Sequence, residues 1–310
     1  MDQIICVVGP TASGKTALAV ELAKFTKGEV VSCDSMQIYR RMDIGTAKPT
    51  KEEMQGIPHH MIDIIEPDED FSVGRYVEMA TPIVEDILAR GKTAIIAGGT
   101  GLYVDNLIKG GEFAPTPSTG CRERLERMVE LRGIEPLVEE LRKIDPVALD
   151  KSQGNPRRII RALEVFQETG ETITAHNART ANLPPRFDPL WIGTDYANRQ
   201  DLYDRIDLRV RLMVQDGLLE EIREILSSGI PEKATAMQAI GYKEFIDAMA
   251  GRSAMEEAIA QVQQSSRRYA KRQQTWFKRN EKIHWLLRTP GQSAEEIFSA
   301  ARALAANFDK

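Results

Sequence analysis

The chain of 310 residues has 42% hydrophobic and 28% charged residues, a composition typical of a globular protein with a substantial core. Its formal net charge of −5 argues against broad, non-specific binding of nucleic acid but leaves room for a local basic surface. We find no apolar run of membrane-spanning length, and because a core strand is predicted from residue 4 we expect no signal or transit peptide. The three cysteines are scattered without a C-x-x-C pair, which argues against disulfides or a zinc site and favours the cytoplasm.

The first candidate site is a glycine-rich loop at residues 9–16, called the phosphate loop here because it fits the phosphate-binding pattern G-x-x-x-x-G-K-[ST]. Residues 4–8 predict a buried strand before it and residues 17–24 predict a helix after it, which is the context that the motif requires. Backbone N–H groups and the positive helix end would hold phosphate oxygens, Lys15 would reach the terminal oxygens, and the Thr16 hydroxyl would ligate Mg²⁺. The predicted diphosphate or nucleotide site comprises Gly9, Pro10, Thr11, Ala12, Ser13, Gly14, Lys15 and Thr16.

Asp34 follows a second predicted strand at residues 29–33. We predict that this strand neighbours the phosphate loop. Asp34 would then lie at the carboxyl edge of the sheet, where open α/β proteins bind their ligands. The competing interpretation is that Asp34 caps a helix, and the two roles can coexist.

Further elements follow in order. Residues 59–65 predict a strand and residues 71–90 an amphipathic helix. Residues 93–97 predict another buried strand, which leads into the glycine-rich segment 98–103. Glycines after a strand allow the backbone to approach a ligand closely. This strand ends without Asp or Glu, so a Walker-B acid for Mg·ATP is not evident there.

The segment 110–117 is rich in Gly and Pro and predicts a linker. We therefore predict an α/β fold, a P-loop NTPase-like parallel sheet with flanking helices and an inserted all-helical subdomain. The catalytic core with C-terminal helical additions would comprise residues 1–115 and 186–310, and the insertion residues 116–185.

The insertion is strongly charged, with helices expected at 120–132, 134–143 and 155–169. Three arginines lie on the first two turns of the last of these helices. Cations at a helix N-terminus oppose the macrodipole, so contact with an anion is the better use for them.

The C-terminal part returns to the sheet with a predicted strand at 190–194, followed by a long helical stretch at 199–226. The longest predicted helix, 255–282, is rich in Lys and Arg interleaved with aromatic residues, and a last strand is expected at 283–287. In an acidic chain this basic helix resembles a surface that contacts a phosphate backbone. A solvated helix face over an aromatic core stripe is the alternative.

Besides the phosphate loop, short motifs are spread over most of the chain. They are Asp-Ser-Met-Gln-Ile-Tyr at 34–39, Asp-Ile-Gly-Thr-Ala-Lys-Pro at 43–49, Gly-Gly-Thr-Gly-Leu-Tyr at 98–103, Arg-Ala-Leu-Glu-Val at 161–165, Gly-Tyr-Lys at 241–243 and Lys-Arg-Gln-Gln-Thr-Trp-Phe at 271–277. In this combination and order they resemble the tRNA dimethylallyltransferase (tRNA isopentenyltransferase) family. The sequence shows no C-terminal zinc-finger extension of the eukaryotic kind, so the resemblance is to the bacterial form.

The resemblance implies transfer of a dimethylallyl group from dimethylallyl diphosphate to N6 of the adenosine 3′ of the tRNA anticodon, with Mg²⁺ as cofactor. It implies Asp34 as general base, Thr100 as a hydrogen-bonding partner near the adenine, and Arg209, or else Arg205, as the arginine that stabilises the diphosphate. The expected partners are the tRNA anticodon stem-loop and dimethylallyl diphosphate, without a membrane, and the expected state is a cytoplasmic monomer. The tRNA contacts it implies are Asp34, Ser35, Met36, Gln37, Thr100, Arg122, Arg157, Arg158, Ile159, Ile160, Arg161, Lys271 and Arg272.

Two other functions are compatible with the residues alone. A P-loop small-molecule kinase would hold ATP in the loop and use Asp34 on a substrate hydroxyl, but the missing acid after 93–97 and the basic helical additions argue against it. An RNA-binding protein that uses a nucleotide as a switch would instead hydrolyse ATP or GTP. An aspartate-rich prenyl synthase is disfavoured, because the sequence has no D-D-x-x-D motif.

Overall fold

The computed structural model describes residues 2–110, 113, 119–181 and 184–308. The chain forms two compact units. One comprises Met1–Ile108 with Arg186–Lys310 and contains the sheet, and the other is the helical unit Lys109–Pro185. Most of the predicted linker at 110–117 lies outside the described residues. No helix in the described part of the chain has the length and apolar character needed to cross a membrane.

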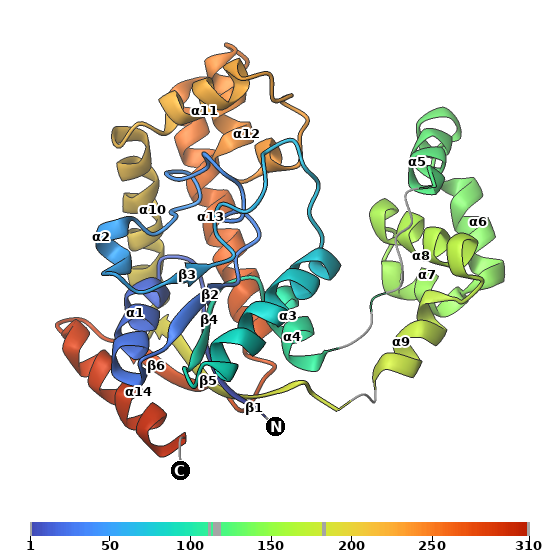
Figure 1. The fold of residues 1–310 in the computed structure, drawn as a ribbon. Coiled ribbons are helices and arrows are strands. Elements are labelled where there is room, and N and C mark those ends of the chain that lie inside the picture. The colour runs from blue at the N-terminus through green and yellow to red at the C-terminus, as the bar shows by residue number, and fades with distance from the viewer. Residues whose placement is uncertain (1, 111–112, 114–118, 182–183, 309–310) are drawn as a thin grey trace. The chain divides into compact units, whose positions relative to one another are not determined.

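A six-stranded parallel sheet forms the centre of the first unit (Figure 1). The strands are β1 (Asp2–Val8), β2 (Glu29–Ser32), β3 (His59–His60), β4 (Ala94–Gly98), β5 (Phe187–Tyr196) and β6 (His284–Arg288). Their order across the sheet is β3-β2-β4-β1-β5-β6, and every neighbouring pair is parallel. Val8 at the end of β1 pairs with Gly98 of β4 and Gly193 of β5, so the segments that follow these strands leave the same edge of the sheet. The predicted α/β fold class is confirmed.

Helices cover both faces of the sheet, as a parallel sheet requires (Figure 1). They are α1 (Lys15–Thr26), α3 (Val73–Ala89), α4 (Gly101–Lys109) and α14 (Ala294–Phe308). Strand side chains alternate between the faces, so Ile5 and Val7 share one face and pack with Leu18 of α1 and Ala301 of α14. Helices α3 and α4 lie on the opposite side (Figure 1). The strands are therefore buried from both sides, which accounts for their continuous apolar runs.

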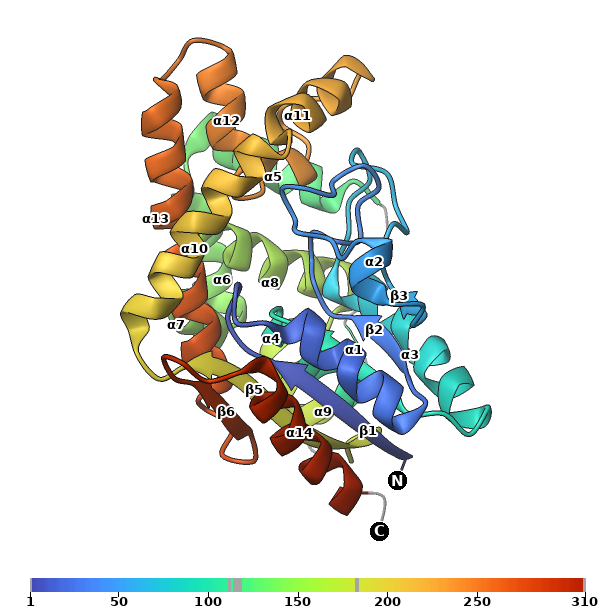
Figure 2. The ribbon, with the colours of Figure 1, turned by 90° about the vertical axis from the view of Figure 1, so that its left-hand side faces the viewer.

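A second core lies on the side of the sheet where the strands end (Figure 2). Its helices are α10 (Arg199–Gln215), α11 (Leu218–Ser227), η1 (Ala236–Gln238), α12 (Tyr242–Met249) and α13 (Met255–Phe277), and the short helix α2 (Lys51–Met54) lies in the segment between β2 and β3. Ile38 from the segment after β2 packs with Ile222, Phe245 and Val262 from three of these helices. Figure 2 shows α10 and α13 side by side, in agreement with the hydrophobic cluster that Leu202 and Ile206 of α10 form with Ala270 of α13. This layer of helices covers the edge at which the strands end, and the candidate site lies at that edge.

Three predicted elements differ in extent. The strand predicted at 59–65 is only two residues long, because Met61 and Asp63 adopt left-handed backbone with φ of 61° and 55°. The helical stretch predicted at 199–226 is two helices, since Gly217 with φ of 102° separates α10 from α11. The longest helix ends at Phe277 rather than at residue 282.

The helical unit has its own hydrophobic core. Its helices are α5 (Cys121–Arg132), α6 (Glu135–Ile144), α7 (Pro146–Ser152), α8 (Pro156–Thr169) and α9 (Ile173–Ala181). Leu125, Leu137, Leu141 and Leu163 pack together in its centre. The sequence patterns predict α5, α6 and α8 but not α7 and α9, which are short.

Candidate active site

The loop between β1 and α1 owes its shape to three residues with positive φ. The values are 147° at Gly9, 64° at Ala12 and 91° at Gly14. A side chain at Gly9 has no room, since a Cβ there would lie 2.2 Å from the carbonyl oxygen of Thr194. Gly14 is the N-cap of α1, which leaves the first N–H groups of the helix facing the loop. Such a helix start attracts anions, so this geometry suits a phosphate or diphosphate.

Lys15 folds back over this loop. Its Nζ donates a hydrogen bond to the carbonyl oxygen of Pro10 at 2.7 Å. Burial lowers the pKa of Lys15 from 10.5 to about 8, an effect that the Asp34 carboxylate opposes and the Arg209 guanidinium reinforces. Negative phosphate oxygens beside the ammonium group would favour its charged form.

Asp34 follows β2, which β4 separates from β1 in the sheet. Asp34 reaches the site because β2 and β4 end close together: a Cβ on Gly98 would lie 2.1 Å from the carbonyl oxygen of Cys33. Oδ1 of Asp34 accepts hydrogen bonds from the N–H groups of Met36 at 2.8 Å and Gln37 at 3.4 Å. These bonds close a turn and hold the carboxylate in place, whereas the alternative role as helix N-cap is not seen, since residues 35–38 form turns.

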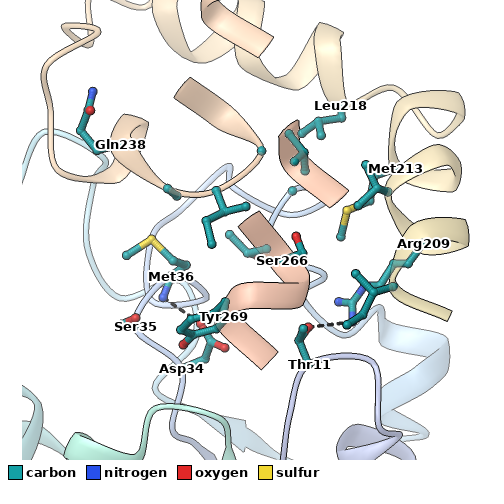
Figure 3. A pocket seen from close by; sticks show the side chains of 18 of the residues that line it. Thr11, Asp34, Ser35, Met36, Arg209, Met213, Leu218, Gln238, Ser266 and Tyr269 are labelled. Carbon is teal, nitrogen blue, oxygen red and sulfur yellow. Dashed lines mark hydrogen bonds between the residues drawn. The ribbon is translucent and has the colours of Figure 1, made fainter. Parts of the chain in front are cut away.

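Thr100, at the exit of β4, lies beside this turn. Its Oγ1 accepts a hydrogen bond from the N–H of Ser35 at 3.2 Å. Tyr269 of α13 also contacts Thr100. Burial raises the pKa of Tyr269 to about 12, the Asp34 carboxylate adds to this effect, and the hydrogen bond with Thr100 opposes it. Figure 3 shows Asp34 and Tyr269 next to each other at the base of a cavity.

The structure brings Arg209 and not Arg205 to the phosphate loop. Nη1 of Arg209 donates to the hydroxyl of Thr11 at 3.5 Å (Figure 3). Burial lowers the pKa of Arg209 below its usual value, and the carboxylate of Asp34 counteracts this. Arg205 lies one helical turn earlier and is exposed.

Two pockets adjoin at this edge, and both are lined by Thr11, Asp34, Thr46, Arg209 and Tyr269. The smaller pocket has a volume of about 90 Å³ and is also lined by Lys15 and Thr16 of the loop. The larger has a volume of about 300 Å³ and a mostly apolar wall (Figure 3). The apolar residues of that wall include Met36, Ile206, Val210, Met213, Leu218, Ile240 and Val262. A polar site for an anion therefore opens directly into a space that suits an apolar group.

Gln273 is a residue of the site that the sequence patterns do not single out. Its side chain is 5% exposed and lines the smaller pocket. Its Oε1 accepts from the N–H of Thr11 at 2.8 Å, and its Nε2 donates to the carbonyl oxygen of Gly99 at 3.0 Å. The motif at 271–277 is notable for its positive charges, so the uncharged, buried Gln273 within it is easily overlooked. Buried Ala270 and Phe277 share the helix face of Gln273, and this spacing is the signal that could have identified it.

The residues expected to contact tRNA in the first unit lie in different surroundings. Ser35, Met36 and Arg272 line the larger cavity, and the Arg272 guanidinium lies 5.4 Å from the centre of the Tyr269 ring. Lys271 is exposed. The amide of Gln37 is engaged within the protein. Its Nε2 donates to the carbonyl oxygens of Thr46 at 3.4 Å and Ala47 at 3.1 Å, and its Oε1 accepts from Ser32 at 3.1 Å.

In the helical unit, Arg157 and Arg158 at the start of α8 are exposed. Arg122 and Arg161 both bind the carboxylate of buried Glu164, at 3.0 and 2.7 Å. Ile159 and Ile160 are buried in the core of this unit, so their part in RNA binding stays a prediction that depends on their arginine neighbours. A groove of about 330 Å³ is lined by Lys151, Ser152, Asn155, Arg157, Arg158, Arg161, Thr174 and Asn177, among others.

The resemblance implies Mg²⁺ at this site. Among the described residues, no group of three or more His, Cys, Asp or Glu side chains could hold a metal ion. Thr16 and Asp34 line the smaller pocket together. Because Mg²⁺ is usually bound by one or two protein oxygens together with substrate phosphates and water, these residues fit an ion that arrives with a diphosphate.

Comparison with known families gives a consistent result. The IPP transferase family model matches residues 37–280, and the isopentenyl transferase model matches residues 2–67. The tRNA dimethylallyltransferase of Caldanaerobacter subterraneus subsp. tengcongensis is 48% identical over 298 residues, which are 95% of each chain. That of Acetivibrio thermocellus is 43% identical over 310 residues, 99% of each chain.

Solved structures agree with the sequence matches. The tRNA isopentenylpyrophosphate transferase of Bacillus halodurans has a TM-score of 0.74 and 41% identity, covering 100% of this chain and 97% of that one. A eukaryotic dimethylallyltransferase acting on tRNA has a TM-score of 0.85 and 28% identity, covering 100% of this chain and 79% of that one.

Proposed function

The chain belongs to the IPP transferase family of tRNA prenyltransferases, and we propose that it transfers the dimethylallyl group of dimethylallyl diphosphate to N6 of the adenosine 3′ of the tRNA anticodon. The observation that carries this proposal is the pair of adjoining pockets. The polar pocket at the loop suits a diphosphate, and the larger apolar cavity suits the allylic group and an adenine. Asp34 and Arg209 line both pockets, at the boundary where the two reactants would meet.

The diphosphate is bound by the start of α1 and by Lys15. The lysine exchanges the carbonyl oxygen of Pro10 for phosphate oxygens, a better partner for its charge. Thr16, together with oxygens of the diphosphate, would hold Mg²⁺ in the smaller pocket. When bound, Mg²⁺ supplies positive charge that stabilises the departing diphosphate.

In the transfer, the N6 lone pair attacks the allylic carbon while the bond from that carbon to the diphosphate oxygen breaks and its electron pair goes to that oxygen. Negative charge therefore grows on the diphosphate. Lys15 and Arg209 are positioned to stabilise it, and partial burial strengthens their effect. The allylic carbon tolerates positive character, so the reaction needs no covalent intermediate on the protein.

Asp34 takes the proton that N6 releases. An aryl amine is a poor nucleophile, since its lone pair is delocalised into the ring, and a carboxylate that accepts the proton makes attack easier. Backbone N–H groups of residues 36 and 37 hold Oδ1 and so orient the carboxylate. A general base of this kind contributes about 10²–10⁴-fold. The hydroxyl of Thr100, next to the turn that carries Asp34, would hydrogen-bond the adenine.

The adenine must leave the anticodon stack to enter the larger cavity, and loop nucleotides are the usual targets of sequence-specific RNA recognition. Ser35, Met36 and Arg272 line that cavity and would contact the extruded base. The exposed arginines of α8, Arg157 and Arg158, would bind RNA phosphates.

A donor test decides between this function and a small-molecule kinase, which family membership does not favour. The protein is incubated with unmodified tRNA, Mg²⁺ and either dimethylallyl diphosphate or ATP, and the RNA is weighed by mass spectrometry. We expect a gain of one dimethylallyl group with the allylic donor alone. Consumption of ATP on a small-molecule panel, without a mass gain on any tRNA, would overturn the proposal.

A further inference from the structure

One buried amide joins three segments that surround the smaller pocket. Gln273 belongs to α13, accepts a hydrogen bond from the N–H of Thr11 in the phosphate loop, and donates one to the carbonyl oxygen of Gly99 after β4. The amide oxygen thus has a donor as its partner and the amide nitrogen has an acceptor, and this fixes the orientation of the amide group. At 5% exposure the side chain is shielded from water, which would otherwise compete for both bonds.

Gly99 and Gln273 form a matched pair. A Cβ at Gly99 would lie 2.0 Å from Nε2 of Gln273, so any side chain at this position would displace the amide. The carbonyl oxygen of Gly9 is 3.4 Å from the same Cβ position, which is an ordinary van der Waals distance, so the glutamine amide is the group that a side chain here would displace. The backbone here is packed around the glutamine rather than around an apolar side chain.

The bond to Thr11 has a consequence for the ligand. An N–H that is committed to Gln273 is not available to a phosphate oxygen, so the diphosphate must use N–H groups further along the loop, nearer Lys15. The position of the loop, and with it the position of the diphosphate, is therefore defined relative to α13.

The same helix carries the other side of the reaction. Tyr269 lies one helical turn before Gln273, and Arg272 immediately precedes it, and both line the larger cavity. Helix α13 thus forms one wall of the larger cavity, where the acceptor base would bind. Through the amide of Gln273 it also contacts the phosphate loop, where the leaving group would bind.

We propose that Gln273 is a positioning residue for the transfer, which aligns the diphosphate in the loop with the base in the larger cavity. This inference rests on the proposed function. Reacting atoms that are misplaced by about 1 Å cost on the order of 10²-fold in rate. Loss of the amide should therefore lower kcat far more than it changes the KM for the donor, since Lys15 and the helix start still bind the diphosphate.

The first test compares Gln273→Met with Gln263→Met. Gln263 lies on the same helix, donates to the carbonyl oxygen of Asp207 and lines neither pocket. We expect Gln273→Met to lower kcat by about 30–100-fold with little change in the donor KM, and Gln263→Met to stay within about twofold of the wild type. Kinetics are measured at a temperature where thermal unfolding shows all proteins fully folded. Equal kcat values for the two variants would overturn the proposal.

A second variant, Gln273→Glu, separates positioning from simple stability. Its ionised carboxylate can accept from Thr11 but repels the carbonyl oxygen of Gly99, whereas its protonated form can donate to that oxygen and restore both bonds. Burial, the neighbouring carbonyl and the carboxylate of Asp34 favour the protonated form of this introduced group, whereas Lys15 and Arg209, which line the same pocket, oppose this; we expect burial and the carbonyl contact to dominate. The kcat of this folded variant, divided by that of the wild type, should therefore rise as the pH is lowered from about 8 to about 5.5. A ratio that stays flat or falls would contradict the proposal.

Binding of inorganic diphosphate, followed by calorimetry, gives a readout that does not depend on turnover. We expect Gln273→Met to retain affinity within about threefold, because the charged contacts remain. A loss as large as that in kcat would overturn the positioning role and make Gln273 a binding residue. If the wild type itself transfers no group to tRNA, the proposed function fails; if the wild type is active and Gln273→Met equals it, only this inference fails.

Discussion

Arg209 Nη1 donates to the hydroxyl of Thr11 at 3.5 Å, although 198 positions separate the two residues in the sequence. The contact joins α10 to the phosphate loop and holds the guanidinium at the boundary of the two pockets. A distance of 3.5 Å is at the outer limit for a hydrogen bond, so little is lost when the guanidinium turns from the hydroxyl to a diphosphate oxygen. Burial around the charge makes that second interaction stronger than it would be in water.

Arg209→Gln should lower kcat by about 10²–10³-fold, the range observed when a group that stabilises transition-state charge is removed. Arg205→Gln, on the exposed side of the same helix, is the matched control and should stay within about twofold of the wild type. Single-turnover rates at saturating tRNA and donor measure both. Similar losses in the two variants would show that the contact of Arg209 with the loop has no special part in the reaction.

Asp34→Asn should lower kcat by about 10²–10⁴-fold, since the amide cannot accept the proton from N6. The substitution keeps an oxygen that can accept from the N–H groups of Met36 and Gln37, so the turn should stay intact. The affinity for tRNA and the temperature of unfolding should therefore change little. Asp247→Asn, which removes an exposed partner of Arg252, is the control. A loss in kcat below about tenfold would remove Asp34 from the role of base.

The lowered pKa of Lys15 predicts how activity depends on pH. Above about 8 the ammonium group of the free enzyme loses its proton, and with it the charge that attracts the diphosphate. The ratio kcat/KM for the donor reports the free enzyme, so it should fall by up to about tenfold per pH unit above this value. Lys15→Arg keeps its charge and should lack this alkaline decline. A wild-type ratio that stays constant to about pH 9.5, or the same decline in the variant, would contradict the assignment.

The two kinds of arginine in the helical unit should affect RNA binding differently. Arg157 is exposed at the start of α8, whereas Arg122 is paired with Glu164, a carboxylate that it shares with Arg161. Arg157→Gln should reduce the slope of log Kd against log salt by about 0.7–0.9, the loss of one phosphate contact. Arg122→Gln should reduce it less. Binding to an anticodon stem-loop over a series of salt concentrations measures both, and an equal effect of the two substitutions would show that pairing with Glu164 does not decide which arginine binds RNA.

Features that depend on local sequence could be predicted. The apolar runs of β1, β2 and β4 and the glycines of the phosphate loop identify a parallel sheet with an anion site at its edge. The insertion of β4 between β1 and β2 could not be predicted, because strand order is decided by how the crossovers pack and not by the strands themselves. The end of β3 depends on left-handed backbone at Met61, a residue without a preference for it.

Part of the site could not be predicted from local sequence patterns either, because it depends on contacts between segments that are distant in the sequence. The two partners of Gln273 lie 262 and 174 positions away in the sequence, and only the tertiary fold brings them together. Asp34 and Lys15, in contrast, each belong to a recognisable motif at the ligand-binding edge of the sheet, and the two line one pocket as expected. Mg²⁺, the monomeric state and the cytoplasmic location remain predictions, since they concern partners and surroundings that lie outside the fold.

The proposed reaction requires that the exocyclic amine of one adenosine attacks the allylic carbon. The most direct measurement uses two synthetic anticodon stem-loops that differ at the nucleotide 3′ of the anticodon, which is adenosine in one and inosine, with oxygen in place of the amine, in the other. Each is incubated with the protein, Mg²⁺ and dimethylallyl diphosphate, and weighed by mass spectrometry. We expect a gain of one dimethylallyl group on the adenosine substrate and none on the inosine substrate. An equal gain on both, or none on either, would contradict it.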